Sequence, residues 1–237
     1  MKRLVAVLVG LALLVTGCSS GAGGASKTEL TVFAAASLKA PFEEIGRQFS
    51  AANPDVKVTF NFAGSRALVD QLSEGAKADV LATADEKSMA KATETKLVGE
   101  TTIFATNTLV LVTPPNNPAT ITGLNDSLNG RKLVICADEV PCGRATQTLA
   151  RNLGVTLTPV SQENSVTSVL AKVTSGEADA AVVYATDAKG AGDKVHSVTI
   201  DGADKVVNKY PIAQTSATSN KDAAASFMAY VQKQGRS

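Results

Sequence analysis

Strand and helix patterns alternate along the first part of the chain, and this alternation limits the possible folds more than any other feature. Residues 29–35, ELTVFAA, are apolar and β-branched, as buried strands are. Residues 37–54 then carry apolar side chains at the spacing of one helix face and end at a proline. The pattern continues with a strand at 56–63, a helix at 65–75, a strand at 78–84 and a helix from Asp85. Such a series predicts a mainly parallel sheet covered by helices.

The alternation resumes after residues 106–115, a strand that ends in two prolines and that we interpret as a crossing between two lobes. The further predicted elements are strands at 131–137, 157–161, 178–184, 196–201 and 210–216, and helices at 122–130, 142–153, 165–175 and 220–234. We therefore predict an α/β protein with two mainly parallel sheets, flanked by helices and joined by two hinge crossings. The predicted lobes are residues 28–108 plus 213–237 (lobe I) and 109–212 (lobe II).

The first residues have the pattern of an export signal. Lys2 and Arg3 precede an apolar run that is too short to cross a bilayer. The run leads into LVTGC, which resembles the bacterial lipobox, so we predict a signal peptide at 1–17 and lipidation of Cys18. Residues 18–27 are small and are predicted to form a flexible tether. The protein is then extracytoplasmic, with the lipid as its only membrane anchor; an ordinary secreted protein cleaved nearby is the alternative.

Cys136 and Cys142 are the remaining cysteines, and outside the cytoplasm such a pair is expected to form a disulfide. Free thiols are the alternative, although a thioredoxin-like redox site has a shorter spacing. The one histidine, His196, is distant and cannot complete the ligand set that zinc requires, so no metal site is predicted. Asp79 and Asp85 are expected to cap and orient turns and not to bind metal.

The strand-to-helix junctions lack catalytic side chains. In open α/β sheets, ligands lie beyond the carboxyl ends of strands, at the N-termini of the following helices. These positions hold no carboxylate pair, no Ser-His-Asp set and no glycine-rich phosphate loop. They hold hydroxyl groups and backbone N–H groups at the positive ends of helix dipoles, which suit a small oxyanion. The nearly balanced charge, 23 basic and 22 acidic residues, argues against a nucleic-acid partner.

Taken singly, each of these groups also has an ordinary structural interpretation. Ser37 and Ser65 stand where a helix accepts a serine N-cap. Tyr184 fits a half-buried core position, and Val166 offers only its main chain, because its side chain belongs to an apolar stripe. Arg144 fits a solvated side chain in the first turn of a helix. The recurrence of hydrogen-bond donors at such junctions in both predicted lobes is the stronger signal.

Four segments carry a resemblance that covers nearly the whole chain after the tether. They are VFAAASLKAPFEEI (32–45), FNFAGSRALVDQLSEGAKADVLATADEKSM (60–89), DEVPCGRAT (138–146) and ADAAVVYATDA (178–188). These segments resemble the molybdate-binding proteins of bacterial ABC importers. The resemblance implies a two-lobed periplasmic-binding fold of type II that closes about a hinge, with no catalysis and no cofactor. It also implies molybdate or tungstate as ligand and an ABC transporter permease as partner; a monomer is the simplest expectation.

Carried over by motif, the resemblance implies five neutral hydrogen-bond donors to the oxyanion. They are the hydroxyls of Ser37, Ser65 and Tyr184 and the main-chain amides of Cys142 and Val166. Cys142 replaces a common alanine of the family, and a disulfide there would hold its amide in the donating direction.

Two further features depart from the family pattern, and two other functions stay open. Arg66, beside Ser65, replaces a small polar residue and is expected at the rim or in solvent. The chain ends at VQKQGRS (231–237) without the short terminal strand expected in the family. The sequence also permits a binding protein for another oxyanion or a small organic acid. The other possibility is an exported enzyme that exchanges thiols, or that holds a phosphorylated substrate with Arg66 and Arg144.

Overall fold

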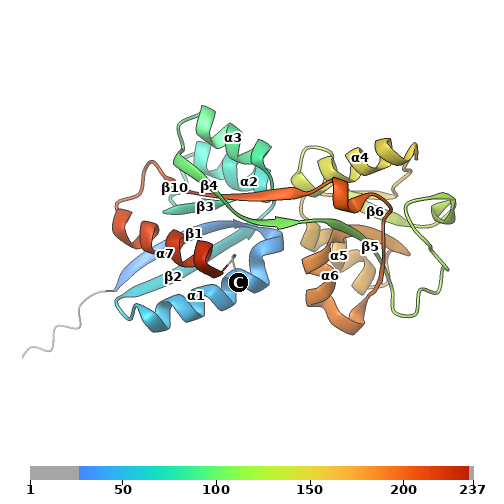
Figure 1. The fold of residues 1–237 in the computed structure, drawn as a ribbon, viewed down its shortest axis with the longest axis horizontal. Helices are drawn as coiled ribbons and strands as arrows, with labels where there is room; N and C mark the ends of the chain where they lie inside the picture. Colours follow the sequence, from blue (N-terminus) through green and yellow to red (C-terminus); the bar gives the residue numbers. More distant parts are fainter. Residues whose placement is uncertain (1–26, 235–237) are drawn as a thin grey trace, which may run out of the picture.

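The computed structural model describes residues 27–234. The predicted signal peptide at 1–17, the predicted lipidation site Cys18 and nearly all of the predicted tether lie outside these residues. The described elements form two bodies that lie side by side, each built on a five-stranded sheet (Figure 1). Within the described residues, no helix is long and apolar enough to span a bilayer.

From here on, lobe I is the body around the first sheet. Its strands are β1 (Thr28–Ala35), β2 (Val56–Ala63), β3 (Val80–Ala82), β4 (Val98–Asn107) and β10 (Asn208–Thr215). They lie in the order β2-β1-β3-β10-β4. β1 pairs in parallel with β2 and β3, whereas β10 runs antiparallel to β3 and β4. The parallel pairs require crossover connections, which the helices supply.

Helices cover both faces of this sheet. They are α1 (Lys39–Ala52), α2 (Ser65–Ser73), α3 (Glu86–Glu94) and α7 (Lys221–Gln234). α1 and α7 lie on one face, and α2 and α3 on the other (Figure 1). Phe42 and Phe49 of α1 both contact Phe227 of α7, whereas Leu68 of α2 and Met89 of α3 share a second cluster. The apolar stripes of the sequence are thus the buried faces of the helices.

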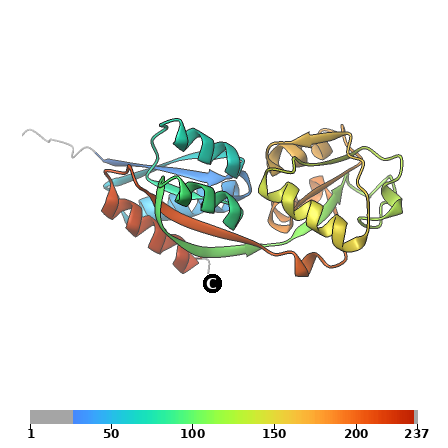
Figure 2. The same ribbon diagram turned by 90° about the horizontal axis from the view of Figure 1, so that it is seen from above.

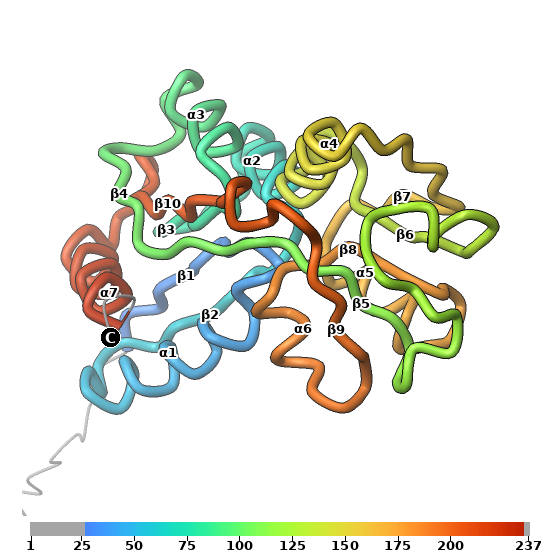
Figure 3. The backbone as a smooth tube through the Cα atoms, turned by 45° about the vertical axis from the view of Figure 1, so that its right-hand side comes forward, coloured from blue at the N-terminus to red at the C-terminus, as the bar shows by residue number. Residues whose placement is uncertain are grey.

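Lobe II is the body around the second sheet. Its strands are β5 (Leu109–Thr113), β6 (Leu133–Cys136), β7 (Ser161–Glu163), β8 (Ala180–Tyr184) and β9 (His196–Val198), in the order β7-β6-β8-β5-β9. β6 is parallel to β7 and β8, and β5 is antiparallel to β8 and β9. Its helices are α4 (Pro141–Leu153), α5 (Val166–Thr174) and α6 (Ala185–Ala191). α4 covers one face of this sheet and α5 and α6 the other (Figure 3).

Two segments join the lobes. β4 ends at Asn107 and β5 begins at Leu109, and the chain returns to the first sheet at Asn208. Asn107 and Asn208 are partners in the β4–β10 ladder, so the two crossings lie side by side (Figure 2). The two α/β lobes and their crossings confirm the predicted fold class, and the antiparallel strands β5 and β10 make each sheet mixed. The predicted lobe boundaries, after 108 and after 212, stay predictions.

Residues 122–130 were predicted as a helix but form only one 3-10 turn, Asp126–Leu128. Side chains satisfy the loop backbone there: Asn125 Oδ1 accepts the N–H of Ser127, and Ser127 Oγ accepts the N–H of Thr122. Asparagine and serine side chains compete in this way with helical hydrogen bonds. The prediction was therefore wrong for this segment.

Three other elements differ from the sequence prediction. β4 was not predicted, because it is an edge strand whose first half is largely exposed and carries no apolar alternation. α6 was not predicted because it has only seven residues. The strand predicted at 157–161 was placed too early, since β7 begins at Ser161. The remaining short 3-10 turns are Ala36–Leu38, Gly192–Lys194 and Ala203–Lys205.

We expect Phe42→Ala to lower the free energy of unfolding by about 3–5 kcal/mol. Phe42 is fully buried, and its ring contacts those of Phe60, Phe104 and Phe227. Urea unfolding followed by circular dichroism measures the change. Val160→Ala is the control, because Val160 is 62% exposed, and its effect should stay within about 0.5 kcal/mol. Equal effects of the two substitutions would contradict the assignment of the core.

Candidate functional site

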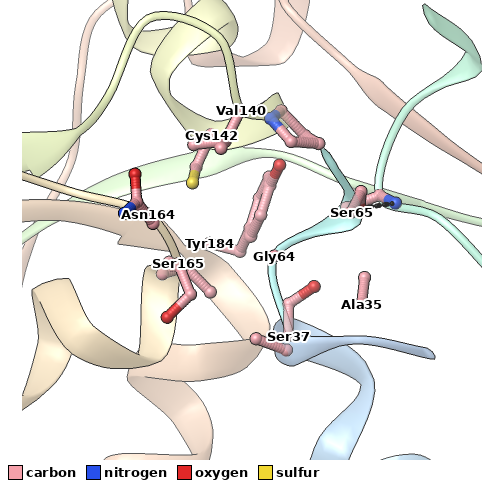
Figure 4. A pocket seen from close by; sticks show the side chains of 13 residues that line it. Ala35, Ser37, Gly64, Ser65, Val140, Cys142, Asn164, Ser165 and Tyr184 are labelled. Atoms are coloured by element: carbon pink, nitrogen blue, oxygen red, sulfur yellow. Dashed lines mark hydrogen bonds between the residues drawn. The ribbon is translucent and has the colours of Figure 1, made fainter. Parts of the chain in front are cut away.

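A small cavity lies between the two lobes (Figure 4). The volume in which the centre of a water molecule can lie is about 20 Å³. This is more than one water molecule requires. All five residues that the sequence analysis nominated line it: Ser37, Ser65, Cys142, Val166 and Tyr184. The other lining residues are Ala35, Ala36, Gly64, Ala84, Val140, Pro141, Asn164 and Ser165.

Ser37 and Ser65 reach the cavity from lobe I, and neither is a helix N-cap. Ser37 lies inside the 3-10 turn that leads into α1, and Ser65 is the first residue of α2, one position past the N-cap. Ser65 Oγ accepts the N–H of Ala84 at 3.0 Å, and Ser37 Oγ lies 3.0 Å from the hydroxyl of Tyr210. The interpretation of the two serines as N-caps is therefore wrong.

α4 and α5 present their N-termini to the cavity from lobe II. Pro141 opens α4 and is followed by Cys142, whereas Val166 opens α5 directly after its N-cap, Ser165. The first N–H groups of a helix have no carbonyl partner within that helix. The amides of Cys142 and Val166 are therefore available donors at the positive ends of two helix dipoles.

The position of the Cys142 amide is held by two local restraints. Cys136, the last residue of β6, forms a buried disulfide with Cys142, as predicted. The next residue is Gly143, where an added Cβ would lie 1.9 Å from the carbonyl oxygen of Ala137. Only glycine fits such a close approach. The disulfide and the glycine together allow the start of α4 to pack closely against the end of β6 and hold it there.

Tyr184 ends β8 and is only 1% exposed. Its phenol oxygen accepts a hydrogen bond from Asn208 Nδ2 at 3.0 Å, and its backbone N–H donates to Asp187. Burial raises the pKa of Tyr184 well above its usual value, with smaller contributions from Tyr210 and from the charges of Asp85 and Asp187. The phenol therefore stays neutral and keeps a proton that it can donate.

The described residues that line this cavity include no lysine, arginine, histidine, aspartate or glutamate. Elsewhere within 27–234, no group of three His, Cys, Asp or Glu side chains is placed to hold a metal ion. The polar groups at the cavity are hydroxyls, one side-chain amide and backbone groups at helix starts. Oriented N–H and O–H dipoles of this kind suit a small oxyanion and give no support for a metal cation.

Arg144 and Arg66 bridge the lobes and do not line the cavity. Arg144 Nε donates to Asp85 Oδ2 at 2.8 Å, and the two side chains are only 22% and 15% exposed. The prediction of a solvated Arg144 was wrong, because helix position alone did not reveal the carboxylate of the other lobe. Arg66 is half exposed and pairs with Glu139 of lobe II at 3.3 Å, which fits the predicted rim position.

Asp85 and Asp79 have the structural roles predicted for them. Asp85 is the N-cap of α3 and accepts the N–H of Ser88 at 2.9 Å. Asp79 accepts the N–H of Thr31 at 2.7 Å and so ties β3 to β1. His196 is exposed at the start of β9.

The residues that lie behind the cavity hydroxyls were not predicted. Asn208 donates to the Tyr184 phenol, and Tyr210 contacts Ser37. Both lie on β10, distant in sequence from the residues they contact, and no local pattern distinguishes them from other strand residues. Two further lining residues were not predicted. They are Gly64 of lobe I and Asn164 of lobe II, which lie against each other.

The chain matches known proteins over nearly its whole length. Residues 30–237 match the family described as bacterial extracellular solute-binding protein. The molybdate-binding protein ModA of Mycobacterium tuberculosis is 43% identical over 235 residues, which cover 96% of this chain and 90% of that protein. ModA of Escherichia coli is 34% identical over 209 residues, which cover 83% of this chain and 80% of that protein.

A solved structure has the same fold. The periplasmic molybdate-binding protein of Azotobacter vinelandii superimposes with a TM-score of 0.76 at 24% identity, over 86% of this chain and 92% of that chain. These matches confirm the resemblance found in the sequence and the two-lobed periplasmic-binding fold. The matched proteins are named for binding, in agreement with the prediction that the chain is not an enzyme.

Asp187, which accepts the N–H of Tyr184, should make stability depend on pH. Burial raises the pKa of Asp187 to about 7, above the value of the unfolded chain. The folded state therefore binds the proton more tightly, so this contribution is complete below about pH 4 and is lost as the pH rises to about 7. The free energy of unfolding should fall by at most about 1.4 kcal/mol per pH unit in that window.

Asp187→Asn should remove this slope, since the amide oxygen can still accept the Tyr184 N–H. Chemical unfolding of both proteins across the pH range measures the difference. Asp204→Asn at an exposed position is the control and should keep the wild-type slope. Identical slopes for wild type and Asp187→Asn would contradict the raised pKa of this carboxyl group.

Proposed function

The chain belongs to the bacterial extracellular solute-binding protein family, and from this premise we propose that it captures molybdate in the cavity between its lobes. The observation that carries the proposal is a cavity lined by neutral donors from both lobes, with no charged side chain among the described residues that line it. The molybdate-binding relatives, among them one that is 43% identical, support this ligand.

In the proposed complex, five groups donate hydrogen bonds to the oxyanion. The hydroxyls of Ser37 and Ser65 come from lobe I, and the amides of Cys142 and Val166 and the hydroxyl of Tyr184 come from lobe II. Molybdate carries no proton at neutral pH, so every contact can be a donor. The dipoles of α2, α4 and α5 supply the partial positive charge that a cation would otherwise provide.

A cavity of donors alone also explains which anions are rejected. Hydrogen phosphate carries a proton that needs an acceptor, and leaving that proton unpaired is unfavourable. Sulfate has no proton but has shorter bonds, so some donors are out of its reach. Tungstate has nearly the dimensions of molybdate, and we expect it to bind as well.

Capture by closure of the lobes is supported by contacts across the cavity. A Cβ added to Gly64 would lie 2.2 Å from the carbonyl oxygen of Asn164 in the opposite lobe. The Arg144–Asp85 and Arg66–Glu139 pairs also join the lobes. The structure thus has the lobes in contact, and an anion that touches both stabilises this state over an open one.

Delivery and attachment complete the proposal. The closed form would be recognised by the permease of an ABC importer. Lipidation of Cys18 would hold the protein at the outer side of the cell membrane, with residues up to 27 as the tether. We propose that the chain works as a monomer, because its two lobes alone enclose the cavity.

Removing one hydroxyl from either lobe should weaken molybdate binding. We expect Ser37→Ala and Tyr184→Phe each to reduce the binding free energy by about 1–3 kcal/mol, because each leaves part of the anion without a donor. Isothermal titration of residues 26–237 measures the affinities. Ser197→Ala, at an exposed position of β9, should bind as the wild type does. Unchanged affinity in both site variants would refute the site.

Gly64→Ala should separate closure from donation. Gly64 has φ −59° and ψ 139°, which alanine adopts freely, so lobe I should fold normally. The methyl group would meet Asn164 and Ser165 of lobe II and hold the lobes apart. We expect molybdate affinity to fall at least about tenfold, because the closed state is less populated.

Small-angle scattering with and without molybdate should show that the Gly64→Ala variant no longer contracts as the wild type does. Gly99→Ala is the matched control, since the nearest atom to its added Cβ is 3.8 Å away. Wild-type affinity and contraction in Gly64→Ala would argue against closure as the capture step.

A further inference from the structure

Asn208 connects the two lobes directly behind the cavity. It is buried at the start of β10, where the chain returns to the first sheet. Its Nδ2 donates to the carbonyl oxygen of Ala84 in lobe I and to the phenol oxygen of Tyr184 in lobe II, both at 3.0 Å. A carbonyl oxygen can only accept, so the contact with Ala84 fixes which end of the amide faces Tyr184.

The direction of this hydrogen bond determines what Tyr184 can do. Because the phenol oxygen accepts the N–H of Asn208, the phenol proton is left for another acceptor. Tyr184 lines the cavity, and an anion held there is the strongest acceptor within its reach. The Asn208 amide thus turns a group that could either donate or accept into a donor.

Ser65 in lobe I also accepts a hydrogen bond from behind the cavity. The N–H of Ala84 donates to Ser65 Oγ at 3.0 Å, so the Ser65 proton is also left for another acceptor. Ala84 lies in the turn between β3 and α3 and itself lines the cavity. One residue therefore orients a hydroxyl on each side of the cavity: Ser65 through its N–H, and Tyr184 through its carbonyl oxygen and Asn208.

We propose that Asn208 is a specificity-determining positioning residue, which forces the Tyr184 hydroxyl to donate and thereby excludes oxyanions that carry a proton. This inference rests on the proposed capture of an oxyanion between the lobes. Asn208 itself does not line the cavity, so its effect on the anion passes through Tyr184. Without its N–H, the phenol can rotate and accept the proton of hydrogen phosphate.

The test is a competition titration of Asn208→Leu in mildly alkaline buffer. Protein loaded with molybdate is titrated with inorganic phosphate, and the ratio of the two affinities is compared with that of the wild type. We expect the preference for molybdate over phosphate to fall about tenfold or more. The reason is that the Tyr184 hydroxyl is no longer held as a donor to molybdate and can accept the proton of hydrogen phosphate. Asn208→Ala removes the same donor without the bulk of leucine and should show the same change.

A double-mutant cycle separates positioning from a general structural role. In a Tyr184→Phe background the phenol is absent, so Asn208→Leu should leave the ratio unchanged. Asn61→Leu is the matched control: it removes a partly buried amide that bonds Gln71 and does not line the cavity, and the ratio should stay at the wild-type value. Thermal unfolding verifies that each variant is folded.

Two results would overturn the inference while leaving the proposed function in place. One is an affinity ratio that stays at the wild-type value in both Asn208 variants, either because both affinities fall equally or because phosphate still fails to displace molybdate. The other is a change of ratio that is just as large in the Tyr184→Phe background. A wild-type protein that does not bind molybdate would overturn the proposed function and the inference together.

Discussion

An anion that leaves water without meeting a cation must be stabilised by dipoles that already point at it. In this protein that requirement accounts for the arrangement of the helices around the cavity. α2, α4 and α5 each begin there, because each follows the carboxyl end of a strand that faces the other lobe. The alternation of strand and helix in the sequence therefore has an electrostatic consequence, since it directs several helix N-termini at one point.

Orientation of these dipoles depends on groups that do not themselves donate to the anion. The disulfide of Cys142 and the close packing of Gly143 hold the start of α4, and Ala84 and Asn208 fix the direction of two hydroxyls. Such groups give up their own freedom during folding and not during binding, which reduces the entropy lost when the anion arrives. The proposed affinity thus rests as much on this supporting layer as on the five donors.

The two-lobed architecture could be predicted from the strand–helix periodicity, which is a local signal. The five lining residues were implied by the resemblance of the junction motifs to those of molybdate-binding proteins. The contacts between the lobes could not be predicted from the sequence. Arg144 was predicted to be solvated, because its sequence position does not reveal Asp85 of the other lobe. Asn208 and Gly64 likewise carry no local sequence signal for their partners. The helix predicted at 122–130 failed for a different reason, since asparagine and serine side chains there bond the backbone of the loop.

The pairing of the two crossing segments limits how the lobes can move. β4 and β10 are joined by a ladder that extends to Asn107 and Asn208, at the point where both chains leave the first sheet. A two-stranded ribbon flexes out of its plane far more easily than it shears along its length, because shearing breaks its ladder of hydrogen bonds. In the proposed closure the lobes would therefore rotate about a single axis, and their separation is the one coordinate that the proposed permease partner would recognise.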